Sequence, residues 1–218
     1  MGDPAVRYFS LYQPVVDLAT RATVGYEATL HGERAGQALA PGELFAGTTS
    51  IDATLELDRV GWETALAGCG DWLGDALLFV KLGSGRVSFG ALAQALDSSA
   101  LPASRLVVEL APGRSAAGRI AVRQCTEACR GLGVGVALVD VADAAQVDAL
   151  DARVDVVKLS RELAEEHATP AATIAAALRH GARPLAFGIE TEQQARRLQT
   201  LGMQWGQGYL FGRPRLPA

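Results

Sequence analysis

Cysteine, aromatic residues and long apolar runs are all scarce in this chain of 218 residues. There are three cysteines, and aromatic residues make up 6% of the sequence. An odd number of cysteines without a CxxC pair excludes a disulfide framework and favours reduced thiols. Cys125 and Cys129 lie four positions apart, as on one helix face, and no histidine or further cysteine completes a set of about four zinc ligands. We therefore expect a cytoplasmic protein without a structural metal.

Targeting and polyanion-binding signals are missing as well. No apolar run reaches the roughly 18 residues that a membrane-spanning helix needs. The first residues, MGDPAVRYFSLYQPVV, lack the basic lead and unbroken apolar core of a signal peptide. The formal net charge is −4, and the basic residues are scattered rather than gathered in a patch. We expect neither a membrane nor a nucleic-acid polymer as a partner.

Apolar residues are plentiful and recur in short runs. They make up 49% of the chain against 20% charged residues, which is enough for a large core. The runs begin at intervals that a βα unit of about 30 residues can fill, and helix-like segments ending in glycine lie between several of them. Alternating strands and helices predict an α/β fold with a mostly parallel sheet, open or closed. The expected strands are LLFVKL (77–82), RLVVEL (105–110), GVALVD (135–140), VDVVKL (154–159), RPLAFGIE (183–190) and QGYLF (207–211).

The front of the chain has a different pattern. YFSLYQPVVDL (8–18) and VGYEATL (24–30) read as two strands joined by a turn, so the first strand is expected to run antiparallel to its neighbours. SIDATLELDRVGWETALAG (50–68) then reads as a long amphipathic helix. No linker or break in composition follows, which predicts one domain over residues 1–218.

Ionisable residues stand near the C-terminal ends of the apolar runs. A lone buried charge is costly, but in an α/β barrel these strand ends open onto the active-site face. For any single residue, the simpler interpretation is that the charge marks where a strand leaves the core. Six equivalent placements favour a shared polar cleft. The six are Glu27, Lys81, Glu109, Asp140, Lys158 and Glu190, and Gln207 begins the last run.

Three segments resemble motifs of the EAL domain of bacterial cyclic di-GMP phosphodiesterases. YQPVVDLATRATVGYEATL (12–30) is similar to the opening hairpin of that family, with Glu27-Ala28-Thr29 at the E-A-L motif. VDVVKLSREL (154–163) is similar to the strand that carries the family's lysine. GIETEQQARRLQTLGMQWGQGYLFGRP (188–214) matches the C-terminal signature. The resemblance covers nearly the whole chain and implies a modified TIM-type (β/α)8 barrel with an antiparallel first strand.

The resemblance also implies a chemistry. Active members hold one or two Mg²⁺ or Mn²⁺ ions, which activate a water that cleaves cyclic di-GMP to linear pGpG; hard oxygen ligands suit these ions. The implied metal ligands are Glu27, Glu109 and Asp140, the implied catalytic groups are Lys158 and Glu190, and Gln207 stands at a substrate-binding glutamine.

Several positions depart from the family pattern. Lys81 stands where the family has a metal-binding asparagine, and Val139 replaces the first aspartate of the family's D-D pair. His31 stands at the arginine that holds a substrate phosphate, and Phe187 at the first glutamate of E-G-V-E, so both belong to the implied substrate pocket. Residues 141–144 replace the rest of the D-D-F-G-T-G loop without its glycines.

These departures predict a broken metal site with vestigial ligands. An ammonium about 4 Å from a cation is repelled by roughly 4 kcal/mol per pair of unit charges at an intermediate effective dielectric. We therefore hypothesise that the Lys81 ammonium lies between Glu27 and Glu109 and neutralises them; the alternative is that Lys81 extends into solvent. No cofactor is expected, and Mg²⁺ or Mn²⁺ would be needed only for residual activity.

Three functions stay open at this point. The first is a degenerate, inactive EAL-like domain that serves as a regulatory or interaction module for an unidentified protein partner in bacterial signalling. The second is a sensor that binds cyclic di-GMP without cleaving it. The third is a metal-dependent phosphodiesterase with residual activity. The joint loss of metal ligands, loop glycines and the phosphate-binding arginine favours the first.

Overall fold

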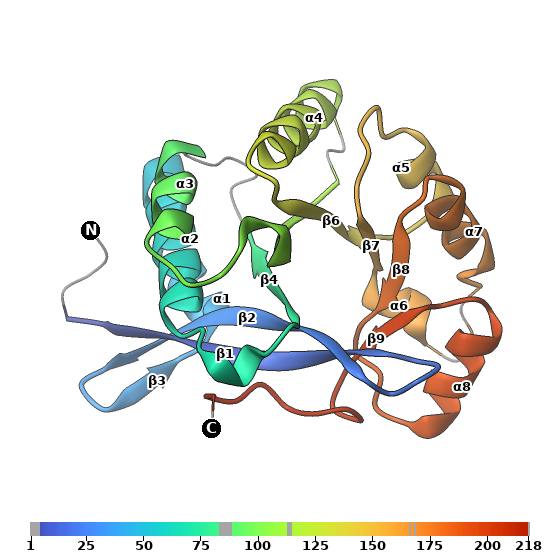
Figure 1. Ribbon diagram of the computed structural model, residues 1–218, viewed down its shortest axis with the longest axis horizontal. Coiled ribbons are helices and arrows are strands. Elements are labelled where there is room, and N and C mark those ends of the chain that lie inside the picture. The colour runs from blue at the N-terminus through green and yellow to red at the C-terminus, as the bar shows by residue number, and fades with distance from the viewer. Residues whose placement is uncertain (1–4, 83–88, 113–114, 166, 168, 218) are drawn as a thin grey trace.

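A closed β-barrel surrounded by helices forms the centre of the computed structural model, which describes residues 5–82, 89–112, 115–165, 167 and 169–217 (Figure 1). The nine strands of the described chain form one sheet in the order β1-β9-β8-β7-β6-β5-β4-β2-β3, and β1 also pairs with β2. That pairing closes all strands except β3 into an eight-stranded barrel. The strands are β1 (Arg7–Asp17), β2 (Thr23–Arg34), β3 (Gln37–Leu39), β4 (Leu77–Lys81), β5 (Leu106–Leu110), β6 (Gly135–Val141), β7 (Val156–Leu159), β8 (Arg183–Ala186) and β9 (Trp205–Gln207).

Strand β1 is the antiparallel member of the barrel. It runs antiparallel to β2 on one side and to β9 on the other, whereas the pairs from β2–β4 round to β8–β9 are parallel. The predicted hairpin and the predicted α/β barrel with an antiparallel first strand are therefore confirmed.

The two largest differences from the expected strand ends occur in β8 and β9, and glycine explains both. The run 207–211 is not a strand, because β9 ends at Gln207 and Gly208 starts a turn in which Phe211 and Gly212 donate backbone hydrogen bonds to its carbonyl. Strand β8 likewise ends at Ala186, since Gly188 has φ +78°, a conformation that interrupts a strand. Glu190 thus lies in the loop beyond the strand.

Helices cover the outside of the barrel, and the longest, Ile51–Ala67, lies within the segment 50–68 that the sequence predicts as a helix. Side-chain caps help to set their starts: Ser50 accepts a hydrogen bond from Ala53 N, and Thr191 forms a capping box with Gln194. Helices of four to six residues, α1, α5 and α6, were not predicted, because a single turn leaves no periodic pattern. The helices are α1 (Pro41–Ala46), α2 (Ile51–Ala67), α3 (Phe89–Asp97), α4 (Ala116–Gly131), α5 (Ala144–Asp148), α6 (Arg161–Ala164), α7 (Ala171–Arg179) and α8 (Glu192–Thr200), with 3₁₀ turns at Asp71–Leu73 and Ala103–Arg105.

The barrel interior is filled by apolar side chains below its C-terminal end. Phe79 and Trp205 meet edge to face there, with ring centroids 6.4 Å apart. The charged residues follow this apolar layer along the strands. They therefore lie together at the C-terminal opening of the barrel, the mouth. The layer contains Val15, Phe79, Val107, Ala137, Val139, Val156, Leu185 and Trp205. Among the described helices, none is long and apolar enough to cross a membrane.

Candidate functional site

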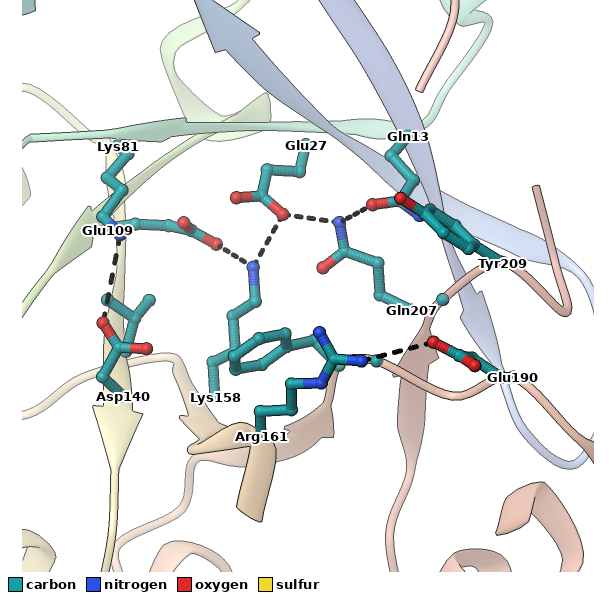
Figure 2. Close-up of a pocket in the computed structure, with 14 residues that line it drawn as sticks. Gln13, Glu27, Lys81, Glu109, Asp140, Lys158, Arg161, Glu190, Gln207 and Tyr209 are labelled. Carbon is teal, nitrogen blue, oxygen red and sulfur yellow. Dashed lines mark hydrogen bonds and ion pairs between the residues drawn. The ribbon is translucent and has the colours of Figure 1, made fainter. Parts of the chain in front are cut away.

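The mouth contains a cavity of about 320 Å³, within the range of small-molecule sites. Seven of the eight barrel strands contribute a side chain to the wall of this cavity, and β8 is the exception. The loops that follow β8 and β9 contribute further wall residues (Figure 2). Most of the residues predicted to form the site are therefore brought together. The lining consists of Gln13, Glu27, Lys81, Glu109, Val139, Asp140, Lys158, Arg161, Phe187, Gly188, Glu190, Gln207, Gly208 and Tyr209.

Lys158 occupies the centre of this mouth. Its Nζ donates hydrogen bonds to Glu27 Oε2 at 2.8 Å and to Glu109 Oε1 at 3.0 Å. All three side chains are largely buried, with exposed fractions of 6% for Lys158, 14% for Glu27 and 2% for Glu109. The hypothesis that Lys81 bridges the two glutamates is wrong, because Lys158 fills that position.

Burial and charge set the protonation of this cluster. Burial alone would lower the pKa of Lys158, but the two carboxylates outweigh it and raise the pKa, so the ammonium stays charged. Burial alone would raise the pKa of Glu27, but Lys158 outweighs it and lowers the pKa. For Glu109, burial and the neighbouring Glu27 raise the pKa to about 7. One ammonium thus donates hydrogen bonds to two glutamates. Of these two acids, Glu109 keeps its proton to a higher pH than Glu27.

Gln207 ties this cluster to the first strand. Its side-chain amide Nε2 donates to Glu27 Oε2 and, at 3.0 Å, to Gln13 Oε1 (Figure 2). Its Oε1 is buried and has no hydrogen-bond partner among the described residues. Gln13 was not singled out from the sequence, although it lies directly opposite Glu27 in the hairpin register.

Asp140 and Lys81 face each other at the rim rather than in the centre. Lys81 Nζ lies 3.9 Å from Asp140 Oδ2, and both side chains are more than half exposed. The β6–β7 register shifts between Leu138 and Val141, and Asp140 has φ +57° within this bulge. The bulge turns Asp140 outward, while Val139 stays in the apolar layer of the interior.

A second exposed ion pair stands on the other side of the rim. Arg161 donates to Glu190 at 3.3 Å, and both side chains are more than half exposed. Phe187 lies deeper, with its ring centroid 5.4 Å from Lys158 Nζ, in cation–π range. Glu190 therefore contacts Arg161 and not the central cluster. Arg161 and Tyr209 were missed in the sequence because exposed residues after a strand carry no periodic signal.

His31 does not fit its predicted substrate-binding role. Its ring stacks on Phe9 across the hairpin, with centroids 6.0 Å apart, and burial lowers its pKa, so it is mostly neutral at pH 7. It is not among the described residues that line the mouth or the cavity beside it.

That neighbouring cavity measures about 500 Å³ and lies between β2, β4, α1 and α2. Its wall is mainly apolar, with Phe45, Leu57 and Val80, but Asp58, a residue only 4% exposed, also lines it. Lys81 lines both this cavity and the mouth, so the two spaces adjoin at its side chain.

Two features define the class of this domain: an α/β barrel with one antiparallel strand, and a mouth in which a lysine is hydrogen-bonded to two glutamates. A model of the EAL domain family matches residues 6–214, and the chain therefore belongs to the EAL domain family. Among curated proteins, none matches the sequence.

Solved structures share the fold. The cyclic di-GMP complex of the PaMucR phosphodiesterase has 24% identity, 97% coverage of both chains and a TM-score of 0.81. The cyclic di-GMP-bound form of a standalone EAL protein from Vibrio cholerae O395 has 18% identity, covers 99% of this chain and 95% of that one, and has a TM-score of 0.86. A manganese and cyclic di-GMP complex of Klebsiella pneumoniae BlrP1 has 23% identity and a TM-score of 0.80, covering 99% of this chain but 57% of BlrP1.

The residues of this mouth do not fit a divalent metal as they are arranged. Glu27 and Glu109, the acids nearest the centre, are both hydrogen-bonded to the Lys158 ammonium. Val139 offers no ligand atom, and Lys81 adds a second positive charge. Within the described residues, no group of three or more histidine, cysteine or acidic side chains is arranged to hold a metal ion.

Proposed function

We propose that this EAL domain is catalytically inactive and acts in cyclic di-GMP signalling as a regulatory module that binds a protein partner in the cytoplasm. The observation that carries the proposal is the loss of ligand atoms at the mouth. Val139 lies in the apolar layer, Lys81 brings a positive charge to the rim, and the described residues hold no group of three or more histidine, cysteine or acidic side chains arranged for a metal ion.

The charge of the mouth supports the loss of hydrolysis. Four acids and three bases line the cavity, so its formal charge is −1. Without a divalent ion, the mouth stays negative and repels the negative charge of a phosphodiester. This repulsion is stronger in a partly buried site than in water. Neutral His31, stacked on Phe9, leaves the position of a phosphate-binding guanidinium unfilled.

We expect no hydrolysis of cyclic di-GMP by this protein. Incubation with cyclic di-GMP and Mn²⁺, followed by chromatography, is expected to yield no pGpG above a protein-free control, because too few ligands remain at the mouth to hold the ions that would activate a water. Formation of pGpG that the Glu27→Ala variant abolishes would contradict the proposal and establish a phosphodiesterase with residual activity.

The partner surface is proposed to include the rim of the mouth. Tyr209 lines the mouth together with Arg161 and Glu190 and is 52% exposed. Affinity capture tests this placement by using the unaltered chain and the Tyr209→Ala variant as two matched baits. The variant is expected to retain less of the partner than the unaltered chain. A partner held equally by both baits would place the interface elsewhere.

Binding of cyclic di-GMP without cleavage is a second candidate, favoured by the cavity beside the mouth. Its apolar wall suits a flat base, and the Asp58 carboxylate can accept from N–H donors of that base. Calorimetry in EDTA is expected to show binding that weakens at least tenfold in Asp58→Asn, since a hydrogen bond to a charged group contributes about 1.5–3 kcal/mol. Asp52→Asn, on the exposed side of α2, is the control. Absence of binding, or equal affinity in both variants, would remove this candidate.

A further inference from the structure

We infer that residues 212–217 form an exchangeable strap that orients polar groups of the mouth, and that an extended segment of a partner protein can take its place on β1. The inference goes beyond the proposed function, because it assigns a regulatory contact to a part of the chain outside the mouth. It requires neither hydrolysis nor binding of cyclic di-GMP.

The strap is held to β1 by few contacts. Among the described residues, β9 pairs with this edge of β1 only at Val15–Asp17. The strap runs back along β1 beyond that point (Figure 1), and Tyr12 and Arg215 exchange backbone hydrogen bonds of 2.8 and 3.1 Å. Gly212 lies close against β1, since a Cβ atom there would be 2.8 Å from Pro14 Cγ. A single bridge contributes little stability, so another extended segment can replace the strap at a small cost in free energy.

A chain of two side-chain amides connects the strap to the centre of the mouth. Gln13 Nε2 donates to the carbonyl oxygen of Gly212 at 3.0 Å, and Gln13 Oε1 accepts from Gln207 Nε2 at 3.0 Å. Gln207 Nε2 also donates to Glu27 Oε2 (Figure 2). The strap is therefore separated from a glutamate of the mouth by only two side chains.

Hydrogen-bonding capacity fixes the orientation of both amides. An amide nitrogen has two hydrogens, and Gln207 uses them on two acceptors, Gln13 Oε1 and Glu27 Oε2. The Gly212 carbonyl holds Gln13 in the orientation that presents its oxygen to Gln207. As a result, Gln207 Oε1 is buried without a hydrogen-bond partner among the described residues. Release of the strap removes this constraint, and Gln207 can then turn its oxygen toward a donor.

The strap also reaches the rim of the mouth directly. The Arg213 guanidinium stacks on the Tyr209 ring, 4.1 Å from its centroid, and Tyr209 lines the mouth. Pro214 and Pro217 favour an extended strap, because proline fixes its own φ and disfavours a helical conformation in the residue before it. A partner segment that replaces the strap would therefore bind as an added strand, through backbone hydrogen bonds, and alter the rim at the same time.

Hydrogen exchange of the Gln207 side-chain amide, followed by NMR, tests the inference. Arg215→Pro removes the backbone N–H that donates to Tyr12, and the Gln207 amide is expected to exchange about fivefold faster, the factor for the loss of one hydrogen bond. Leu216→Pro is the matched control, because this side chain is 58% exposed and no described residue accepts from its N–H. The control should change the exchange rate by less than about twofold.

A peptide with the sequence of residues 212–217 tests whether the strap is exchangeable. In excess, it is expected to bind the Arg215→Pro variant and restore slow exchange of the Gln207 amide, whereas a peptide with the same residues in scrambled order should not. Equal exchange rates in Arg215→Pro and the unaltered protein would overturn the inference. So would a strap peptide that restores nothing.

Two precautions keep the result unambiguous. If Arg215→Pro does not fold, Arg213→Ala loosens the strap by removing its contact with the Tyr209 ring, and unchanged Gln207 exchange in that variant would overturn the inference. The samples contain EDTA and no nucleotide, so the outcome is independent of the pGpG assay. A strap without effect on Gln207 would sink this inference and leave the proposed inactivity intact.

Discussion

Replacing Gly208 with alanine is expected to destabilise the protein by about 3–5 kcal/mol. A Cβ atom at this position would lie 2.0 Å from the carbonyl oxygen of Ile189 and 2.4 Å from its nitrogen. These are backbone atoms, so no side-chain rotation can relieve the overlap. The same backbone bonds to Gln207 O and accepts from Leu210 N, and both hydrogen bonds must stretch. Overpacking of about 1–3 kcal/mol and two weakened hydrogen bonds of about 1 kcal/mol each give the estimate.

Urea denaturation of Gly208→Ala measures this loss directly. Gly131→Ala is the matched control, because Gly131 lies in α4 and a Cβ there meets no atom within 4 Å. Alanine in a helix is favoured over glycine by up to about 1 kcal/mol, so the control should be at least as stable as the unaltered protein. Equal stability of the two variants would contradict the close approach of the loops after β8 and β9.

Glu109→Gln is expected to remove a large pH dependence of stability. Burial and Glu27 raise the pKa of Glu109 from its ordinary value of 4.5 to about 7 in the folded protein. The folded state therefore binds this proton more tightly than the unfolded chain. The resulting stabilisation is complete below about pH 4.5 and is lost as the pH rises through about 7. The full difference amounts to about 3 kcal/mol, and glutamine, which does not titrate, removes it.

The measurement compares urea denaturation of the two proteins at pH 5 and pH 8. We expect the stability of Glu109→Gln relative to the unaltered protein to increase between these two values. Glu190→Gln serves as the control for loss of one acid from the mouth, because its side chain is half exposed at the rim. A parallel pH dependence of the unaltered protein and Glu109→Gln would show that Glu109 does not retain its proton in the folded state.

The barrel itself could be predicted from the sequence, because its signals are local. Apolar runs with a charge near the C-terminal end mark buried strands that open onto one face, and β4, β5, β6 and β7 lie where these runs predict them. The apolar run at 207–211 misled the prediction, since the turn at Gly208 depends on contact with Ile189 far back in the chain. Local pattern carries no information about such a contact.

The central cation could not be predicted for a similar reason. Lys81 and Lys158 have equivalent places in their runs, FVKL and VVKL. One side chain is 57% exposed and the other 6%. The difference arises from the stagger of strands around the barrel, which sets how deep each strand end lies. Only the assembled barrel shows that the lysine of β7 lies between Glu27 and Glu109.

The long-range seam between β1 and β9 is expected to make the mouth form late in folding. Val15 pairs with Gln207 there, and the hydrogen bond from Gln207 to Gln13 spans 194 positions in the sequence. Closing contacts of such separation costs more loop-closure entropy than closing local ones, which slows folding. Until the seam forms, Glu27 lacks its contact with Gln207. The closed barrel and its polar centre are thus completed by the same long-range contact. A nascent chain whose β9 is still inside the ribosome therefore has neither the closed barrel nor the polar centre.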